Sequence, residues 1–324
     1  MSQELETRQQ MENRGIHPSE SLSQHILIDP SALRFFASNV APGGNVLEIG
    51  PGPGNITALI AERARRVVAV EIDRKFEPLL TEVQHRHPNV EVTYKDILSV
   101  NLGKILKGNF FGSNWQIMSN LPFHITEPLL IKLIDLPFND AVFILGDQMA
   151  RRIQIENPDN LEFSKTGLLV QIFFDSSIVM SLPRTSFYPQ PRTDSAIVVL
   201  SRKKKSELTG NPKMAILRKL FVTENKHSPI AKVIKEAMGQ LDNNVIRDKT
   251  ERNRYDRRKL RQDLRSAVRD RLYATHGDRA GNFDRWQREL GKLNIPEEIL
   301  NRPFSSIDNQ DLRNLVNGLN KRYG

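Results

Sequence analysis

The sequence predicts an α/β fold with a largely parallel sheet, followed by a smaller helical domain. The first observation is that short apolar segments alternate with amphipathic ones between about residues 45 and 200. Strands that alternate with helices in this way indicate βαβ units. The second is a glycine-rich turn between the first predicted strand and the first predicted helix. The third is the loss of the strand pattern beyond RKKKSELTGNP (202–212), a charged segment that we interpret as a linker.

Each element follows from its local pattern. The predicted strands are the apolar segments 46–49, 67–72, 90–96, 115–120, 141–146, 168–174 and 196–202. The predicted helices are 56–66, 75–87, 127–135 and a segment around 148–154. Beyond the linker, helical patterns occupy 214–222, 228–241 and 305–319, the last with Ser305, Ser306 or Asp308 placed to cap its start. Ligands on such sheets bind at the carboxyl ends of the strands.

The charge of the chain favours a polyanionic partner. With 47 Lys and Arg against 38 Asp and Glu, the 324 residues carry a net charge of +9. A positive balance of this size favours binding to a polyanion, and nucleic acid is the obvious candidate. The alternative is an enzyme that is merely basic, and charge alone does not separate the two.

The composition excludes several other classes of protein. The chain has no cysteine, which excludes disulfides, thiolate nucleophiles and cysteine-ligated zinc. Its seven histidines show no paired spacing such as HExxH, so we expect no metal. No run of about 18 apolar residues occurs, so we expect no membrane span. Residues 1–20 are polar and resemble neither a secretory signal nor a transit peptide. We expect a flexible tail there and a cytoplasmic protein.

The glycine-rich turn is a candidate cofactor site. VLEIGPGPGNIT places Gly50, Gly52 and Gly54 after a strand and before a helix. Glycine allows close approach of a ligand to the backbone and positive φ angles, and a helix start presents unpaired N–H groups. The pattern therefore suggests a nucleotide-like cofactor, although glycine turns also serve packing. No P-loop lysine follows, which argues against a triphosphate.

Acidic residues accompany this turn at successive strand ends. Glu48 precedes the glycines, Glu71 ends the next strand, and Asp96 ends the third. An acid in the position of Glu71 typically holds ribose hydroxyls, and Asp96 can accept a bond from an adenine amino group. Each acid alone could be a solvated strand end or helix cap. The GxGxG spacing, with a glutamate before it, resembles the S-adenosylmethionine (SAM) methyltransferase fold and differs from the dinucleotide pattern GxGxxG.

The fourth predicted strand ends in a second unusual turn, SNLPFHIT (119–126). Its NLPF resembles the [DN]PP[YF] motif of methyltransferases that modify exocyclic amines. The Asn120 side-chain oxygen and the Leu121 carbonyl can accept the two N6 hydrogens of adenine, and Pro122 stiffens the turn. Phe123 can stack on the base, which is worth roughly 1–3 kcal/mol. The alternative is an ordinary turn at a strand end.

Six segments together resemble one family, the ribosomal RNA adenine N6-dimethyltransferases. They are SQHIL, EIGPGPGNIT, VEID, KDIL, NLPFHIT and SFYPQPRTDSA, all in the family's order. The resemblance covers about residues 20–202 and includes both the small-subunit rRNA dimethylases and the Erm macrolide-resistance enzymes. It implies a Rossmann-like, SAM-dependent methyltransferase sheet with a small C-terminal helical domain. It also implies methylation of a flipped adenine in rRNA, by a monomer that binds rRNA or a ribosomal subunit precursor.

The resemblance assigns roles to individual residues. It implies that the SAM-binding residues are Gln24, His25, Leu27, Glu48, Gly50, Gly52, Glu71, Ile72, Asp96, Ile97 and Asn120. It implies that the target adenine is held by Asn120, Leu121, Pro122, Phe123 and Phe187. The chain departs from the family pattern where His25 replaces an Asn, Ile26 a Phe, Phe123 a Tyr and His124 an Asn. None of these changes removes a group that the chemistry needs.

The predicted domains are a flexible tail (1–20), a catalytic domain (21–203) and a helical RNA-binding domain (204–324) with a basic insertion at about 240–290. Within it, 246–273 holds eleven Arg and Lys against five Asp and Glu, a net charge of +6. We predict that this arm binds rRNA phosphates. The predicted RNA-binding residues are Arg252, Arg254, Arg257, Arg258, Lys259 and Arg261. The alternative is a solvated helix with internal ion pairs.

Several functions stay open at this point. EIGPGPGNIT and NLPFHITEPLL favour the small-subunit enzymes. ERARRVVAVEID and the SQH opening are also compatible with Erm proteins, which methylate large-subunit rRNA and confer antibiotic resistance. A non-catalytic relative that acts as a transcription factor is a further alternative, against which the intact glycine turn and NLPF argue. A DNA adenine methyltransferase would more often show DPPY.

Overall fold

The structure is a computed structural model. It describes residues 3–19, 21–107, 115–122, 125–134, 136–203, 211–221, 227–239 and 288–323. The chain forms two compact units: Met1–Glu156 with Thr166–Lys203, and Asn157–Lys165 with Lys204–Gly324. Among the described residues no helix is long and apolar enough to cross a membrane. In the same part of the chain, no group of three or more His, Asp or Glu side chains could hold a metal ion.

The first unit is built on a seven-stranded sheet with the order β4-β3-β2-β5-β6-β9-β7. Its parallel strands are β2 (Asn45–Ile49), β3 (Arg66–Glu71), β4 (Val90–Tyr94), β5 (Trp115–Asn120) and β6 (Asp140–Gly146). β9 (Ser195–Arg202) runs antiparallel to both β6 and β7 (Phe174–Leu182). The central strands are buried along almost their whole length, as is typical of strands covered on both faces. The predicted, largely parallel α/β sheet is confirmed.

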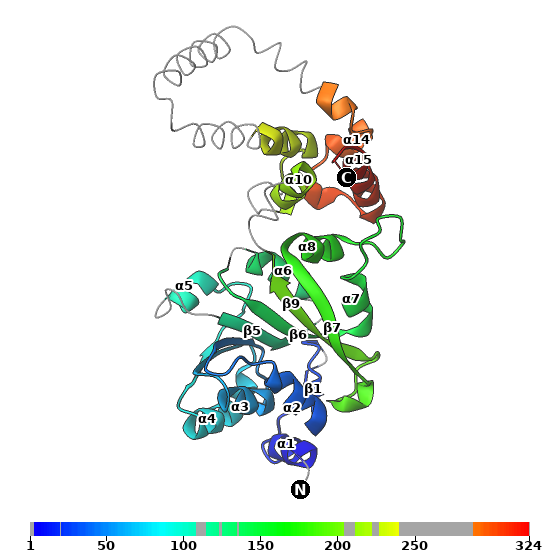
Figure 1. The fold of residues 1–324 in the computed structure, drawn as a ribbon. Coiled ribbons are helices and arrows are strands. Elements are labelled where there is room, and N and C mark those ends of the chain that lie inside the picture. Colours follow the sequence, from blue (N-terminus) through cyan, green and yellow to red (C-terminus); the bar gives the residue numbers. More distant parts are fainter. Residues whose placement is uncertain are drawn as a thin grey trace, which may run out of the picture. The chain divides into compact units, whose positions relative to one another are not determined.

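Helices connect these strands (Figure 1). They are α2 (Pro30–Ser38), α3 (Asn55–Ala61), α4 (Glu77–Arg86), α5 (Leu102–Lys107), α6 (Thr126–Leu133), α7 (Asp147–Arg152) and α8 (Lys165–Phe173), with single 3-10 turns at Arg74–Phe76 and Arg184–Ser186. Local sequence explains the start of α2, because the Asp29 carboxylate accepts a hydrogen bond from the Ala32 N–H at 2.7 Å and Pro30 occupies the first turn.

One predicted strand is wrong. Residues 168–174 belong almost entirely to α8, and the strand β7 begins only at Phe174. The segment LLVQIFF is apolar nearly throughout, and α8 buries almost all of its residues. A short continuous apolar run has no periodicity that separates a buried helix from a buried strand. The sequence pattern therefore located a buried element without fixing its type.

The expected flexible tail at 1–20 also needs correction. Residues Gln3–Glu12 form α1, and Met11 and Ile16 are buried against Phe76, Leu79 and other apolar side chains. α1 ends in a Schellman motif. The Gly15 N–H donates to the Glu12 carbonyl at 3.0 Å, and the Ile16 N–H donates to the Met11 carbonyl at 2.9 Å. Gly15, with φ of +62°, is the sequence signal for this helix end that the prediction overlooked.

A two-stranded ribbon ties distant segments together in the first unit. β1 (Ile26–Leu27) pairs antiparallel with β8 (Phe187–Tyr188). The Ile28 N–H extends the pairing by donating to the Ser186 carbonyl at 2.8 Å. The ribbon thus places the SQHIL segment beside the SFYP segment, about 160 residues later in the chain.

The described part of the second unit is helical. It contains α10 (Pro212–Phe221), helices over 230–239 and 288–291, α14 (Glu297–Leu300), a 3-10 turn (Phe304–Ser306) and α15 (Asn309–Tyr323). Of the three predicted caps for α15, the structure selects Asp308, whose Oδ1 accepts a hydrogen bond from the Asp311 N–H at 2.9 Å. The predicted basic arm, with its candidate residues from Arg252 to Arg261, lies outside the described residues.

Candidate active site

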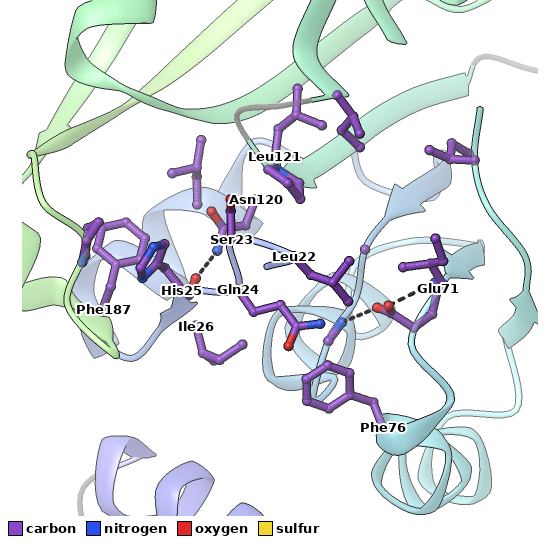
Figure 2. A pocket seen from close by; sticks show the side chains of 18 of the residues that line it. Leu22, Ser23, Gln24, His25, Ile26, Glu71, Phe76, Asn120, Leu121 and Phe187 are labelled. Atoms are coloured by element: carbon purple, nitrogen blue, oxygen red, sulfur yellow. Dashed lines mark hydrogen bonds between the residues drawn. The ribbon is translucent and has the colours of Figure 1, made fainter. Parts of the chain in front are cut away.

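A pocket opens where the parallel strands of the first unit end. It encloses about 990 Å³ of space, its open mouth included. Most of the predicted site residues line it, namely Gln24, His25, Gly50, Gly52, Glu71, Ile72, Asp96, Ile97, Asn120, Leu121, Pro122 and Phe187. Figure 2 shows several of these side chains around the pocket. The carboxyl ends of neighbouring parallel strands meet at one edge of a sheet, which is why residues so distant in sequence converge here.

The glycine turn serves both the pocket and the packing. Gly50, Gly52 and Gly54 all have positive φ angles, +67°, +56° and +83°. A side chain on Gly50 would meet no atom within 4 Å, and Gly50 lines the pocket, so the missing side chain leaves space for a ligand. A Cβ on Gly54 would lie 2.8 Å from Val83 Cγ2, so the third glycine allows α3 to pack on α4.

Glu71 is fixed at the end of β3 by the backbone around it. Its Oε2 accepts the Gly52 N–H at 2.9 Å, and its Oε1 accepts the N–H groups of Ile72 and Asp73 at 2.9 and 2.8 Å. Burial raises the pKa of this carboxyl, while the three backbone bonds oppose that shift. An ionised carboxylate offers about four acceptor positions, so room remains for a hydroxyl donor from a ligand.

An apolar slot with an acidic edge lies next to Glu71. Ile72 is 55% exposed and lines the pocket together with Ile97 and Asp96. Asp96 Oδ1 accepts the Leu98 N–H at 2.8 Å, and the Lys132 ammonium donates to the carbonyls of Ile97 and Leu98 at 2.8 and 2.6 Å. These bonds hold the 96–98 turn in place. A flat aromatic ring with an amino group suits such a slot.

Two predicted cofactor residues do not line the pocket. Leu27 is fully buried in the apolar core between the sheet and its helices. Glu48 is 2% exposed, and its Oε2 has no hydrogen-bond partner among the described residues. Burial raises the pKa of Glu48 to about 8, and the neighbouring Glu71 carboxylate adds to the shift. Both side chains are buried in the interior, although their positions in the sequence motifs suggested contact with a ligand.

The buried carboxyl of Glu48 is predicted to lower the stability of the folded protein at high pH. We expect Glu48→Gln to stabilise the protein at about pH 9 and to leave its stability nearly unchanged at about pH 5. Unfolding returns the pKa of Glu48 from about 8 to 4.5. Between those values the folded state keeps a proton that the unfolded state has lost, so stability falls as the pH rises. One pKa unit is worth about 1.4 kcal/mol, which puts the gain at high pH at roughly a few kcal/mol.

Urea unfolding of the wild type and the variant at both pH values measures this gain. Glu91, on β4 of the same sheet, provides a matched control, because Glu91→Gln removes the same charge from an exposed position. Glu91 forms a surface ion pair with Arg66, and the loss of such a pair costs at most about 1 kcal/mol at either pH. An equal stability difference at the two pH values for Glu48→Gln would contradict the expectation.

Asn120 ends β5 with its amide held in one orientation. Its Nδ2 donates to the His25 carbonyl at 2.6 Å, a bond drawn in Figure 2. Because a carbonyl can only accept, this bond places the amide nitrogen toward His25 and leaves Oδ1 as an acceptor. The Leu121 N–H is bonded to the Ile144 carbonyl at 3.1 Å, and Pro122 completes the turn at the pocket wall. The predicted stacking residue Phe123 lies outside the described residues, as does His124.

The other side of the pocket is formed by the β1–β8 ribbon. Phe187, on β8, is 2% exposed and lines the pocket near His25 and Asn120 (Figure 2). Gln24 is held at both ends of its amide: Oε1 accepts the Ser19 N–H at 2.8 Å, and Nε2 donates to Asp73 at 3.0 Å. Apart from Leu27, Glu48 and the undescribed Phe123, the residues predicted to hold a cofactor and those predicted to hold a base therefore share one pocket.

Sequence reasoning missed some residues of the pocket. Leu22, Phe76, Lys95, Pro191 and Ser195 also line it. Pro191 and Ser195 lie within the SFYPQPRTDSA segment, so the motif itself was the available signal. Phe76 is a fully buried residue in a 3-10 turn after β3, and no local pattern marks it as a pocket residue.

Fold and site together define a class of protein. A parallel sheet carries a glycine turn after β2, an acid at the end of β3 and an amide–proline turn after β5 around a single pocket. This combination is that of the Rossmann-like, SAM-dependent methyltransferases.

The chain belongs to the ribosomal RNA adenine dimethylase family. A sequence model of that family matches residues 17–257. The ribosomal RNA small subunit methyltransferase A of Ligilactobacillus salivarius is 37% identical over 203 residues, which cover 61% of this chain and 68% of that protein. The protein of the same name from Bacillus cytotoxicus is 31% identical over 244 residues, covering 74% and 81%. The predicted family resemblance is confirmed.

A solved structure shares the fold. The dimethyladenosine transferase from Plasmodium falciparum superposes with a TM-score of 0.54 at 24% identity, over 92% of this chain and 99% of that one. The predicted Rossmann-like methyltransferase fold is thereby confirmed as well.

Proposed function

We propose that this protein methylates the N6 amine of adenine in small-subunit ribosomal RNA, using SAM as the methyl donor. The observation that carries the proposal is the fixed amide of Asn120, which is oriented with Oδ1 as an acceptor and which shares a pocket with the glycine turn and Glu71. The names of the relatives above support the small-subunit target. The cytoplasmic location and the monomeric state expected from the sequence stay predictions.

The pocket has features that fit SAM. Glu71 would accept bonds from the ribose hydroxyls, and Ile72 and Ile97 would enclose the adenine ring of the cofactor. Asp96 would accept from that ring's amino group. Gln24 and the side-chain-free surface of Gly50 would face the amino acid end. SAM supplies an electrophilic methyl group on a sulfonium, and it carries no phosphate that these acids would repel.

The part of the pocket that would bind the methyl-accepting adenine, which we call the acceptor side, contains the turn Asn120–Pro122. The chemistry of this adenine explains why an amide and a proline occur together there. The lone pair of an adenine amine is delocalised into the ring and is a poor nucleophile. Asn120 Oδ1 and the Leu121 carbonyl would accept the two N6 hydrogens and favour a more tetrahedral nitrogen. The amine proton becomes acidic once the methyl group is attached, so no strong general base is required. Positioning and electrostatics then supply most of the catalysis.

The basic arm at 246–273 would contribute RNA affinity. We expect that neutralising its predicted RNA-binding residues, Arg252, Arg254, Arg257, Arg258, Lys259 and Arg261, weakens rRNA binding and flattens its dependence on salt. Every phosphate that the arm no longer neutralises reduces the slope of log K against log salt by about 0.7–0.9. Binding titrations across a series of salt concentrations measure the slope. SAM affinity serves as the control, and an unchanged slope would support the alternative of a solvated helix.

Mapping methylated adenines on both rRNAs tests the proposed function. Purified protein with labelled SAM is expected to modify adenines of the small-subunit rRNA or of a subunit precursor. Modification of large-subunit rRNA instead would favour the Erm-type alternative. Failure to transfer methyl groups to either RNA, or to its precursor particle, would leave a non-catalytic binding protein as the better account.

A further inference from the structure

His25 links the three segments that form the acceptor side of the pocket. Its carbonyl accepts the Asn120 Nδ2–H at 2.6 Å, and its ring Nδ1 lies 2.8 Å from the Pro189 carbonyl oxygen. Because Pro189 offers only an acceptor there, Nδ1 carries the proton and donates. The next residue, Ile26, pairs with Tyr188 in the β1–β8 ribbon. One residue therefore connects the turn after β5 to the turn after β8.

This connection lies between the two groups proposed to hold the base. Asn120 is the proposed acceptor for the N6 hydrogens, and Phe187 faces the pocket from β8, two residues before Pro189. Both side chains lie next to His25 in Figure 2. The bond from the imidazole to Pro189 restrains the 187–189 segment relative to the His25 carbonyl, and hence relative to Asn120.

We propose that His25 is a positioning residue for the target adenine, and that its Nδ1–H bond to Pro189 sets the spacing between Asn120 and Phe187. The inference rests on the proposed function and deepens it. It moves His25 from the cofactor group, where the family resemblance placed it, to the acceptor side. The bond to Asn120 is made by the backbone carbonyl of His25, so it remains when the imidazole is replaced. A substitution of His25 therefore isolates the contribution of the Nδ1–H bond to Pro189.

The chemistry of the side chain provides matched variants. The amide nitrogen of asparagine is separated from Cα by as many bonds as Nδ1 of histidine is. The amide nitrogen of glutamine is one bond further from Cα, at the same separation as Nε2 of histidine. His25→Asn can therefore keep a donor for Pro189, whereas His25→Ala removes it and His25→Gln misplaces it. A purely structural role for a half-buried ring would not distinguish Asn from Gln in this way.

Steady-state methylation of rRNA by the full chain tests the proposal. We expect His25→Ala and His25→Gln to lower kcat/KM for rRNA by about three- to tenfold, the worth of one hydrogen bond. His25→Asn should restore most of the loss. SAM affinity, measured by calorimetry without RNA, should stay within about twofold of the wild type in all three variants, since the proposed restraint acts on the acceptor side alone.

The outcomes separate this inference from the proposed function. If the wild type transfers no methyl group to rRNA, the proposed function fails. If the wild type is active but His25→Asn is as impaired as His25→Gln, the positioning role is wrong. A loss of SAM affinity that parallels the loss of kcat/KM would return His25 to the cofactor site and would also overturn the inference. Melting temperatures of the three variants show whether each one folds. If His25→Ala does not fold, the difference in kcat/KM between His25→Asn and His25→Gln tests the positioning role by itself.

Discussion

Replacing Asn120 with alanine is expected to lower kcat for methyl transfer by about 10²–10³-fold, the range seen when one preorganised polar group is removed from an active site. The variant loses the only proposed side-chain acceptor for an N6 hydrogen and leaves the His25 carbonyl without its donor. SAM affinity should change much less, because Glu71 and the glycine turn are untouched. Single-turnover kinetics with rRNA, together with calorimetry for SAM, measure the two effects separately.

Asn120→Asp provides the matched comparison. It keeps an acceptor oxygen at the same position but replaces the donor to His25 with a second oxygen, so two acceptors would face each other. We expect it to be nearly as impaired as Asn120→Ala. If either variant kept wild-type turnover, the assignment of the acceptor site to the turn after β5 would have to be abandoned.

The second large effect is expected at Glu71. Glu71→Gln should weaken SAM binding by about 10–100-fold, since hydrogen bonds to a charged group are worth roughly 1.5–3 kcal/mol. The carboxylate accepts three backbone N–H groups in the folded protein. A glutamine side chain has a single oxygen to accept these three N–H groups. Its NH₂ group would face at least one backbone N–H, and neither group could accept from the other. Both the position of the Gly52 turn and the acceptor for a ribose hydroxyl are then lost.

Calorimetric titration with SAM measures the loss, and Glu77→Gln is its control. Glu77 begins α4, is exposed, and pairs with Arg74 at 3.1 Å, so the same charge is removed close by but outside the pocket. Its SAM affinity should stay within about twofold of the wild type. Equal losses in the two variants would indicate a general electrostatic effect and would contradict a direct role for Glu71.

Much of the site follows from local sequence because of a property of parallel sheets. Gly50, Glu71, Asp96 and Asn120 each follow or end a predicted strand, and such ends meet at one edge. Knowing the strands was therefore enough to bring the four together. The same reasoning could not show that Glu48, one residue before the end of β2, is buried outside the pocket, because the burial of a side chain depends on what packs around it.

Where the prediction failed, the deciding interactions were distant in sequence. The segment 168–174 is helical although its apolar run suits a buried strand, and α1 is ordered through contacts of Met11 and Ile16 with Phe76 and Leu79. Phe76 also lines the pocket, although no pattern in the sequence around it predicts this. Propensity and periodicity report on neighbours along the chain, whereas burial is decided by whatever packs against a residue.

The sequence by itself determined the α/β architecture, the family and the polar groups available for chemistry, because these depend on residue types and their spacing along the chain. Only the tertiary structure decided which way the Asn120 amide points, that His25 links Asn120 to Pro189, and that Glu48 is buried with a raised pKa. Each of these depends on a hydrogen bond or a loss of solvent between segments far apart in sequence, and such contacts exist only once the chain has folded.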